Sequence, residues 1–199
     1  MKRLVIAALA GLVLVGGCGA PEVPQPAYVP PAAQPGEVPE PLAVRIPKLD
    51  AESDLLTLGL DETGAMQVPP VDLPHLAGWY AGADTNEDGD ETKPGQRGSA
   101  VIAGHVDGRG PDGEKGFPGV FARLHELEPG DEVFVEQEGG TELKFVVESV
   151  ERFDKDALPH ERIFRADDAI RLNLITCGGA FDAAAGHYTD NIVAFTKLA

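Results

Sequence analysis

The 199-residue chain contains few cysteines, few basic residues and no long apolar run. Two cysteines cannot build a disulfide-stapled scaffold or a metal site made of cysteines alone. Lysine and arginine number 16 against 33 acidic residues, which gives a net charge of -17. Proteins that bind nucleic acid contact the phosphates through clustered Lys and Arg, so this balance argues against a nucleic-acid partner.

The amino terminus has the pattern of an export signal. Lys2 and Arg3 precede an uncharged, mostly apolar run from Leu4 to Gly17, which is shorter than the roughly 20 residues of a membrane-spanning helix. The run ends in Val-Gly-Gly before Cys18, which resembles the lipobox of a bacterial lipoprotein and implies lipidation of Cys18. An ordinary signal peptide (residues 1–18) and an uncleaved anchor are alternatives. All three place the remaining chain outside the membrane, and lipidation would anchor it at the extracytoplasmic face.

Composition then divides the chain into a tether and one domain. Residues 19–42 are rich in Pro and show no apolar period, which predicts an extended, solvated tether. Residues 43–199 are long enough to bury a core. Short runs of β-branched and aromatic residues, separated by Gly and Pro turns, predict a mostly β domain built as a barrel or sandwich. These runs are Val44–Pro47, Ala100–Gly104, Val133–Val135, Leu143–Val150, Ile170–Thr176 and Asn191–Phe195. One short helix is expected, from Gly119 to Leu127.

Cys177 is the candidate nucleophile. It follows a strand-like run and precedes Gly178-Gly179, where a substrate backbone could approach closely. A thiol attacks as a thiolate, so it needs a partner such as an imidazole. Among the five histidines, His105 is the best placed, since it also follows a strand-like run and has Asp107 two residues away to orient its ring. The alternative is that Cys177 is an inert, buried apolar residue.

The order of these motifs resembles the sortases, and among them class F. The resemblance spans the whole domain and rests on Ala-Gly-His-Val-Asp around His105 and on Leu-Ile-Thr-Cys-Gly-Gly around Cys177. It implies a closed sortase-type β-barrel of about eight strands with one or two short helices. It also implies a cysteine transpeptidase that cleaves a Leu-Pro-x-Thr-Gly-type sorting signal and transfers it to an amine on a cell-wall precursor or a pilin. Its partners would be surface proteins that carry sorting signals, and no cofactor is required.

The resemblance also assigns roles to single residues. Cys177 would form the thioester, His105 would act as general acid and then base, and Thr176 would help to bind the signal. Sortases use an arginine on the strand after the cysteine, but Thr189 stands at that position here. A threonine hydroxyl lacks the charged fork of a guanidinium. Arg109 is a candidate replacement if its glycine-rich loop folds back.

The missing arginine leaves alternatives open. The domain could be a sortase of reduced activity, or a tethered pseudo-sortase that binds sorting signals or cell-wall peptides without turnover. A Cys-His hydrolase of wall peptides is disfavoured, because in that family the nucleophile precedes the histidine, whereas here His105 comes first.

One acidic segment matches the first half of a calcium loop. Asp84, Asn86, Asp88 and Asp90 place oxygen ligands at alternate positions, with Gly89 at the position of the turn glycine. The twelfth position is Gly95, where a bidentate Glu would be expected. A solvated acidic loop without metal is the alternative.

Overall fold

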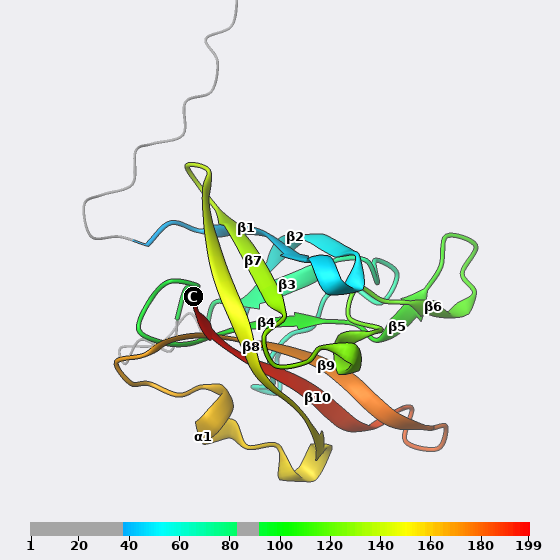
Figure 1. Ribbon diagram of the computed structural model, residues 1–199. Coiled ribbons are helices and arrows are strands. Elements are labelled where there is room, and N and C mark those ends of the chain that lie inside the picture. The colour runs from blue at the N-terminus through cyan, green and yellow to red at the C-terminus, as the bar shows by residue number, and fades with distance from the viewer. Residues whose placement is uncertain (1–37, 83–91) are drawn as a thin grey trace, which may run out of the picture. The chain divides into compact units, whose positions relative to one another are not determined.

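The computed structural model describes residues 38–82 and 92–199 (Figure 1). The expected signal segment, most of the tether and the acidic segment 84–91 therefore lie outside the described residues. Eight strands close a barrel in the order β1-β2-β3-β4-β9-β10-β8-β7, and β1 completes the circle by pairing with β7. The expectation of a mostly β fold with a closed barrel of about eight strands is confirmed.

The strands of the barrel differ widely in length. They are β1 (Pro41–Ile46), β2 (Ala51–Leu58), β3 (Ala77–Tyr80), β4 (Gly98–Gly104), β7 (Glu132–Gln137), β8 (Thr141–Asp154), β9 (Ile170–Asp182) and β10 (His187–Leu198). A separate hairpin pairs β5 (Asp107–Arg109) with β6 (Lys115–Pro118). Among the described residues, helix is limited to α1 (His160–Ile163) and the 3-10 turns η1 (Pro47–Leu49), η2 (Leu124–Glu126) and η3 (Lys155–Ala157).

Alternating side chains form two apolar clusters. Leu172 and Leu174 of β9 point into the barrel, where they meet fully buried residues from the opposite strands such as Phe145. Ile175 belongs to the other face of β9 and packs outside the barrel, in a second cluster that includes Ile163 of α1. The segment containing η3 and α1 thus covers part of the outer face of the barrel near β9 and β10 (Figure 1).

The expected helix from Gly119 to Leu127 is absent, and only the short turn η2 forms within it. Phe121, Leu124 and Leu127 are all buried, and their three-residue spacing is satisfied by a 3-10 turn as well as by an α-helix. Pro129 and Gly130 follow directly, so the chain has no room for another helical turn.

Two boundaries also differ from expectation. β1 begins at Pro41, inside the segment expected to be a tether, because Pro41 pairs with Gln137 of β7 at the very start of the strand, where proline is tolerated. β8 continues to Asp154, beyond the run that ended at Val150. This extension brings the end of β8 beside β10 at Asp190.

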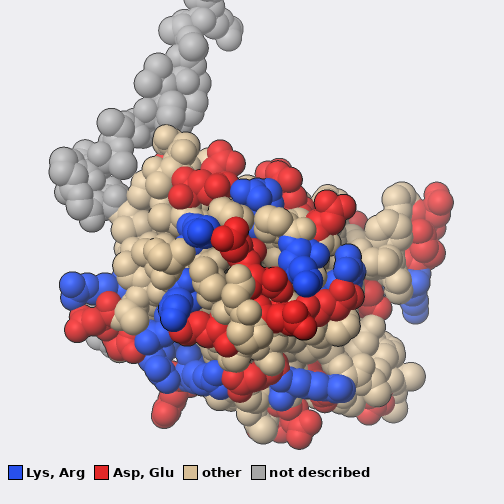
Figure 2. Space-filling model, viewed as in Figure 1, with Lys and Arg blue, Asp and Glu red and all other residues tan. Residues whose placement is uncertain are grey.

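The surface carries both signs of charge. On the face shown in Figure 2, Lys and Arg side chains are interspersed with Asp and Glu and do not gather in one basic patch. In the described ranges, no helix is long and apolar enough to cross a membrane.

Candidate active site

Cys177 lies near the middle of β9 and is half-buried. It pairs across the ladder with Asn191 of β10, which in turn pairs with Phe153 of β8. Three neighbouring strands therefore align at the level of the thiol. Ile175, two residues earlier, belongs to the outer cluster, so the alternation of the strand directs Cys177 to the same outer face.

The two glycines after Cys177 are required by contacts with β10. A Cβ atom at Gly178 would lie 2.8 Å from Cγ1 of Ile192. Gly179 has φ of 81°, and a Cβ atom there would collide with the side chains of Thr189 and Asp190. The sequence suggested that these glycines admit a substrate, but their first requirement is close packing of two strands at a bulge.

His105 follows directly after β4, all seven residues of which are buried. β4 runs parallel to β9, and their register ends with Ala103 beside Ile175. Continuing that register by two residues on each strand brings His105 level with Cys177 on the same face. The ladder therefore explains why residues so far apart in sequence meet.

A hydrogen bond fixes the ring of His105. Its Nε2 lies 2.6 Å from the carbonyl oxygen of Pro69. Because a carbonyl oxygen only accepts, Nε2 carries a hydrogen, and Nδ1 is the nitrogen that can exchange a proton with a substrate. The ring is thus oriented by a backbone carbonyl, and not by Asp107 as the sequence suggested.

Cys177 and His105 line one cavity of about 450 Å³. One wall is apolar and includes Val68, Val71 and Phe181, each at least half exposed. The remaining lining residues are Met66, Pro69, Ala103, Gly104, Asp107, Lys155, Ile175, Thr176, Gly186, His187, Tyr188 and Asn191. The cavity therefore combines a thiol, an imidazole and an apolar surface suited to a peptide.

Asp107 takes part in a contact across this cavity. Tyr188 donates its hydroxyl hydrogen to Oδ2 of Asp107 at 2.6 Å. This hydrogen bond, with burial as the next cause, raises the pKa of Tyr188 to about 12. The neutral phenol is therefore held in place over the entire physiological pH range.

Sequence reasoning missed Lys155. Its Nζ lies 3.7 Å from Sγ of Cys177. The strand that precedes Lys155 was expected to end at Val150, so nothing in the local pattern placed Lys155 near the thiol. The signal available in the sequence was the period-two pattern that continues past Val150 and brings a basic residue to the end of the strand.

The other residues selected from the sequence lie in different places. Thr176 is 4% exposed, lines the cavity, and its Oγ1 has no hydrogen-bond partner among the described residues. Thr189 is exposed at the bulge of β10, where its Oγ1 accepts a 3.2 Å hydrogen bond from the backbone N–H of Ala180.

Arg109 is exposed at the end of β5 and is absent from the cavity lining, because its strand pairs with β6 in the separate hairpin (Figure 1). The structure therefore gives no support to Arg109 as the missing cation.

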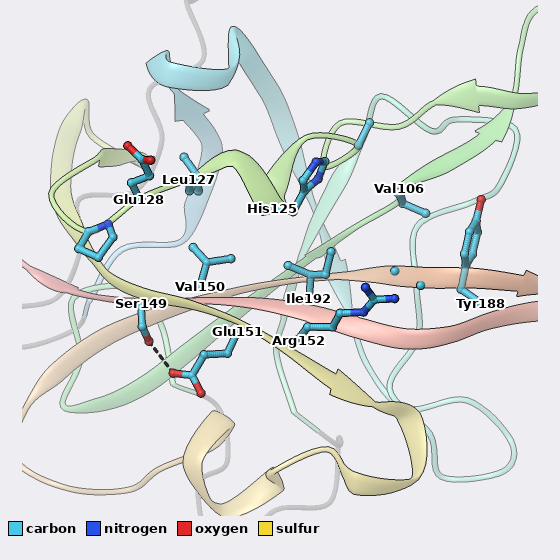
Figure 3. Close-up of a pocket in the computed structure, with 14 residues that line it drawn as sticks. Val106, His125, Leu127, Glu128, Ser149, Val150, Glu151, Arg152, Tyr188 and Ile192 are labelled. Carbon is cyan, nitrogen blue, oxygen red and sulfur yellow. Dashed lines mark hydrogen bonds between the residues drawn. The ribbon is translucent and has the colours of Figure 1, made fainter.

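A second cavity, of about 660 Å³, is lined in part by Gly178 and Gly179, and Figure 3 shows it in close-up. Val150 and Ile192 form part of its floor, below the segment that carries His125 and Leu127. Tyr188 stands at the end opposite Glu128 and lines both cavities. The two cavities therefore meet at the segment that follows the candidate nucleophile.

The residues expected to hold calcium cannot be placed, since segment 84–91 lies outside the described ranges. Within residues 38–82 and 92–199, no group of three or more His, Cys, Asp or Glu side chains is arranged to hold a metal ion.

Comparison with known proteins agrees with the barrel. No curated protein matches the chain. Among solved structures, sortase A of Corynebacterium diphtheriae, in a lid mutant, is 17% identical with a TM-score of 0.55, covering 83% of this chain and 73% of that one. A sortase C1 lid mutant of Streptococcus agalactiae is 18% identical with a TM-score of 0.55 (82% and 70% covered). A sortase D5 transpeptidase of Clostridium perfringens is 17% identical with a TM-score of 0.52 (80% and 79% covered).

These identities are low, so the structural neighbours show the fold alone. The family model named Sortase domain, however, matches residues 44–199, which is most of the chain and includes every strand that lines the cavity of Cys177. The chain therefore belongs to the sortase family.

Proposed function

We propose that this protein is an extracytoplasmic cysteine transpeptidase of class F type that cleaves a Leu-Pro-x-Thr-Gly-like sorting signal and transfers it to an amine. One observation carries the proposal: the thiol of Cys177 and the ring of His105 line the same cavity, in a chain that belongs to the sortase family. One of the similar solved structures is a sortase D5 that is described as a transpeptidase.

The residues of the cavity support a two-step reaction. The proton of the Cys177 thiol first passes to Nδ1 of His105, which makes the ring an imidazolium. The thiolate then attacks the carbonyl carbon of the Thr of the signal, so a C–S bond forms and an electron pair moves to the carbonyl oxygen. When this oxyanion collapses, the C–N bond breaks and the leaving amine takes a proton from Nδ1 of His105. An incoming amine then attacks the thioester, His105 accepts its proton, and Cys177 leaves as thiolate.

The cavity also offers contacts for the signal itself. Val68, Val71 and Phe181 form an apolar surface for the side chain of a leucine. The unpartnered Oγ1 of Thr176 is buried beside the nucleophile, so a hydrogen bond to the signal would remove the cost of leaving it unsatisfied.

We place the acceptor amine in the second cavity. It begins at Gly178 and Gly179, directly after the nucleophile, and so reaches the thioester from the side opposite the sorting signal. Glu128 contributes a carboxylate to its lining, which attracts a cationic amine, whereas Glu151 and Arg152 of the same lining are paired with Arg162 and Asp190.

The second candidate is a pseudo-sortase that binds signals without turnover. Thr189 favours it, because its exposed side chain supplies no charge to the cavity. Loss of one oxyanion donor typically lowers the rate about 10²–10³-fold. The two candidates therefore differ in the amount of product, and not in binding.

The experiment is mass spectrometry of a sorting peptide incubated with the protein and an added amine. A transpeptidase gives the amine adduct, whereas a pseudo-sortase leaves the peptide intact. Cys177→Ala and His105→Ala are the controls and should both give no adduct. An intact peptide with the wild-type chain, across several Leu-Pro-x-Thr-Gly variants, would reject the transpeptidase in favour of the binder.

For the amino terminus we propose anchoring as a lipoprotein through Cys18. Incorporation of a labelled fatty acid in a bacterial host tests this, because Cys18→Ser should abolish labelling. An unlabelled wild-type chain would favour the ordinary signal peptide or the uncleaved anchor.

For the segment 84–91 we propose weak calcium binding by Asp84, Asn86, Asp88 and Asp90. Titration calorimetry of the wild-type chain should give heat that is lost in Asp88→Ala. No heat at millimolar calcium would leave a plain acidic loop.

A further inference from the structure

Lys155 brings a positive charge to the nucleophile from an unexpected direction. Its ammonium nitrogen lies 3.7 Å from the sulfur of Cys177, within hydrogen-bond distance for sulfur. Among the described residues that line this cavity, Lys155 is the single Lys or Arg. The cavity therefore has a cation even though position 189 does not provide one.

Strand register fixes this placement. Phe153 of β8, Asn191 of β10 and Cys177 of β9 lie abreast across three hydrogen-bonded strands. Lys155 comes two residues after Phe153 and begins η3, so it leaves the end of β8 toward the same face as the thiol. The side chain is half-buried, which limits the water that could screen its charge.

The charge of Lys155 is not neutralised by a carboxylate in the part of the chain that the structure describes. The cations nearest to it in sequence are each paired, Arg152 with Asp190 and Arg162 with Glu151. Within residues 38–82 and 92–199, the ammonium of Lys155 forms no such ion pair, and its one hydrogen-bond partner is the thiol. An unpaired ammonium beside a nucleophilic sulfur is an arrangement that favours the thiolate.

We infer that Lys155 is a catalytic residue that takes the place of the arginine missing at position 189. The inference rests on the proposed function and specifies which residue stabilises the negative charge that forms during the reaction. In the resting site the ammonium pairs with the thiolate. When sulfur bonds to the carbonyl carbon, the negative charge moves from sulfur to the carbonyl oxygen, and the three N–H donors on a flexible stem can follow it. Collapse of the oxyanion then expels the amine, which takes its proton from His105.

Thr189 cannot supply the same charge. Its Oγ1 already accepts a hydrogen bond from the N–H of Ala180, and its side chain lies over Gly179, outside the residues that line the cavity. The two positions reach the nucleophile from different strands, β8 for Lys155 and β10 for Thr189. Loss of an arginine on one strand is thus compatible with an active site that has its cation on another.

Alkylation of Cys177 provides the first test, because it does not require turnover. In a Cys18→Ser chain Cys177 is the one remaining thiol. Lys155→Met should slow alkylation by the neutral reagent iodoacetamide about tenfold, because less of the thiol is present as thiolate. Alkylation by the anionic iodoacetate should slow still more, because the variant also lacks the positive charge that attracts this reagent. Lys155→Arg should restore both rates, and Lys144→Met, which removes a lysine near the opposite end of β8 that pairs with Glu132, should change neither.

Turnover of a sorting peptide is the second test. Lys155→Met should lower kcat/KM about 10²-fold, as loss of a donor to the oxyanion does, and Lys155→Arg should recover most of it. If the wild-type chain alkylates in a Lys155-dependent way but turns over no peptide, the proposed function fails and the pairing of Lys155 with Cys177 stands. If Lys155→Met and Lys155→Gln both fold, by thermal melting, and both alkylate at the wild-type rate, the inference is wrong.

Discussion

Tyr188 and Asp107 are joined by a 2.6 Å hydrogen bond that links the start of β10 to the start of β5. Asp107 lies two residues after His105, and Tyr188 lies three residues before Asn191, the ladder partner of Cys177. The bond therefore connects the segment that carries the imidazole to the strand beside the nucleophile. It also forms the boundary between the two cavities, because Tyr188 lines both.

Replacing Tyr188 by Phe should lower kcat/KM by about 3–10-fold, because a net hydrogen bond of about 0.5–1.5 kcal/mol no longer positions the two segments. The pKa of Tyr188 is raised to about 12, so the bond is fully present below pH 10 and is lost as the pH rises through 12. The ratio of the wild-type kcat/KM to that of the variant should therefore stay constant from about pH 6 to about pH 9. Asp107→Asn in a double-mutant cycle should show coupling, and additive effects would contradict the role.

Thr189→Arg should raise turnover of a sorting peptide, up to about tenfold, because a forked cation would be added beside Gly179. The change also removes the hydrogen bonds that join the Thr189 side chain to the N–H of Ala180 and to Asp190. Thr189→Met, which is long but uncharged, is the matched control. A wild-type rate that is already high and is unchanged by arginine would show that the missing arginine does not matter.

Ala122→Phe should fill part of the second cavity, which Ala122 lines. If the acceptor amine binds there, the ratio of amine adduct to hydrolysed peptide should fall about tenfold, which corresponds to about 1.4 kcal/mol of lost binding. Alkylation of Cys177 should be unchanged, since the thiol faces the other cavity. An unaltered product ratio in a variant that melts normally would place the acceptor elsewhere.

Glu151→Gln should lower the melting temperature at pH 7 by about 1–2 °C, because it breaks the ion pair with Arg162 that holds α1 near β8. Both side chains are more than a third exposed, so the pair contributes only about 0.5 kcal/mol. Hydrogen bonds from Arg162 hold the pKa of Glu151 below its usual 4.5. The stabilisation is thus present above pH 4.5 and is lost as the pH falls through the lower, folded pKa.

The difference in melting temperature between wild type and Glu151→Gln should therefore vanish in strong acid. Glu161→Gln, which removes an equal charge from α1, is the control and should melt like the wild type at every pH. A difference that persists unchanged in acid would mean that packing, and not charge, explains the effect.

The strands rich in β-branched residues could be predicted from the sequence, and the others could not. β4 is buried at every position and β9 is buried from Leu172 to Thr176, whereas β2 mixes acidic residues with leucines and β3 has only four residues. The tertiary pairing of β2 with β1 and β3 overrides its weak local pattern. Local sequence thus predicted the strands with dense apolar runs better than it predicted β2 and β3.

Local sequence likewise identified some residues of the candidate site and missed others. His105 and Cys177 could be selected because each follows or lies in a strongly apolar strand. Lys155 could not, because its position depends on how far β8 extends and on the register of β8 against β10, neither of which local sequence specifies. Asp107 was assigned to the wrong partner for a similar reason, since Pro69 and Tyr188 reach the site from distant segments.

The parallel ladder between β4 and β9 makes the geometry of His105 and Cys177 independent of the length of chain between them. Segments such as the β5–β6 hairpin could be lengthened or shortened without moving either residue, whereas deletion of one residue within β4 would turn the imidazole to the opposite face. The spacing of the two residues in sequence is therefore a poor descriptor of this site. Each residue lies two positions after the last ladder pair, Ala103 and Ile175. Insertions in the connecting segments would preserve this offset, so the offset describes the site better.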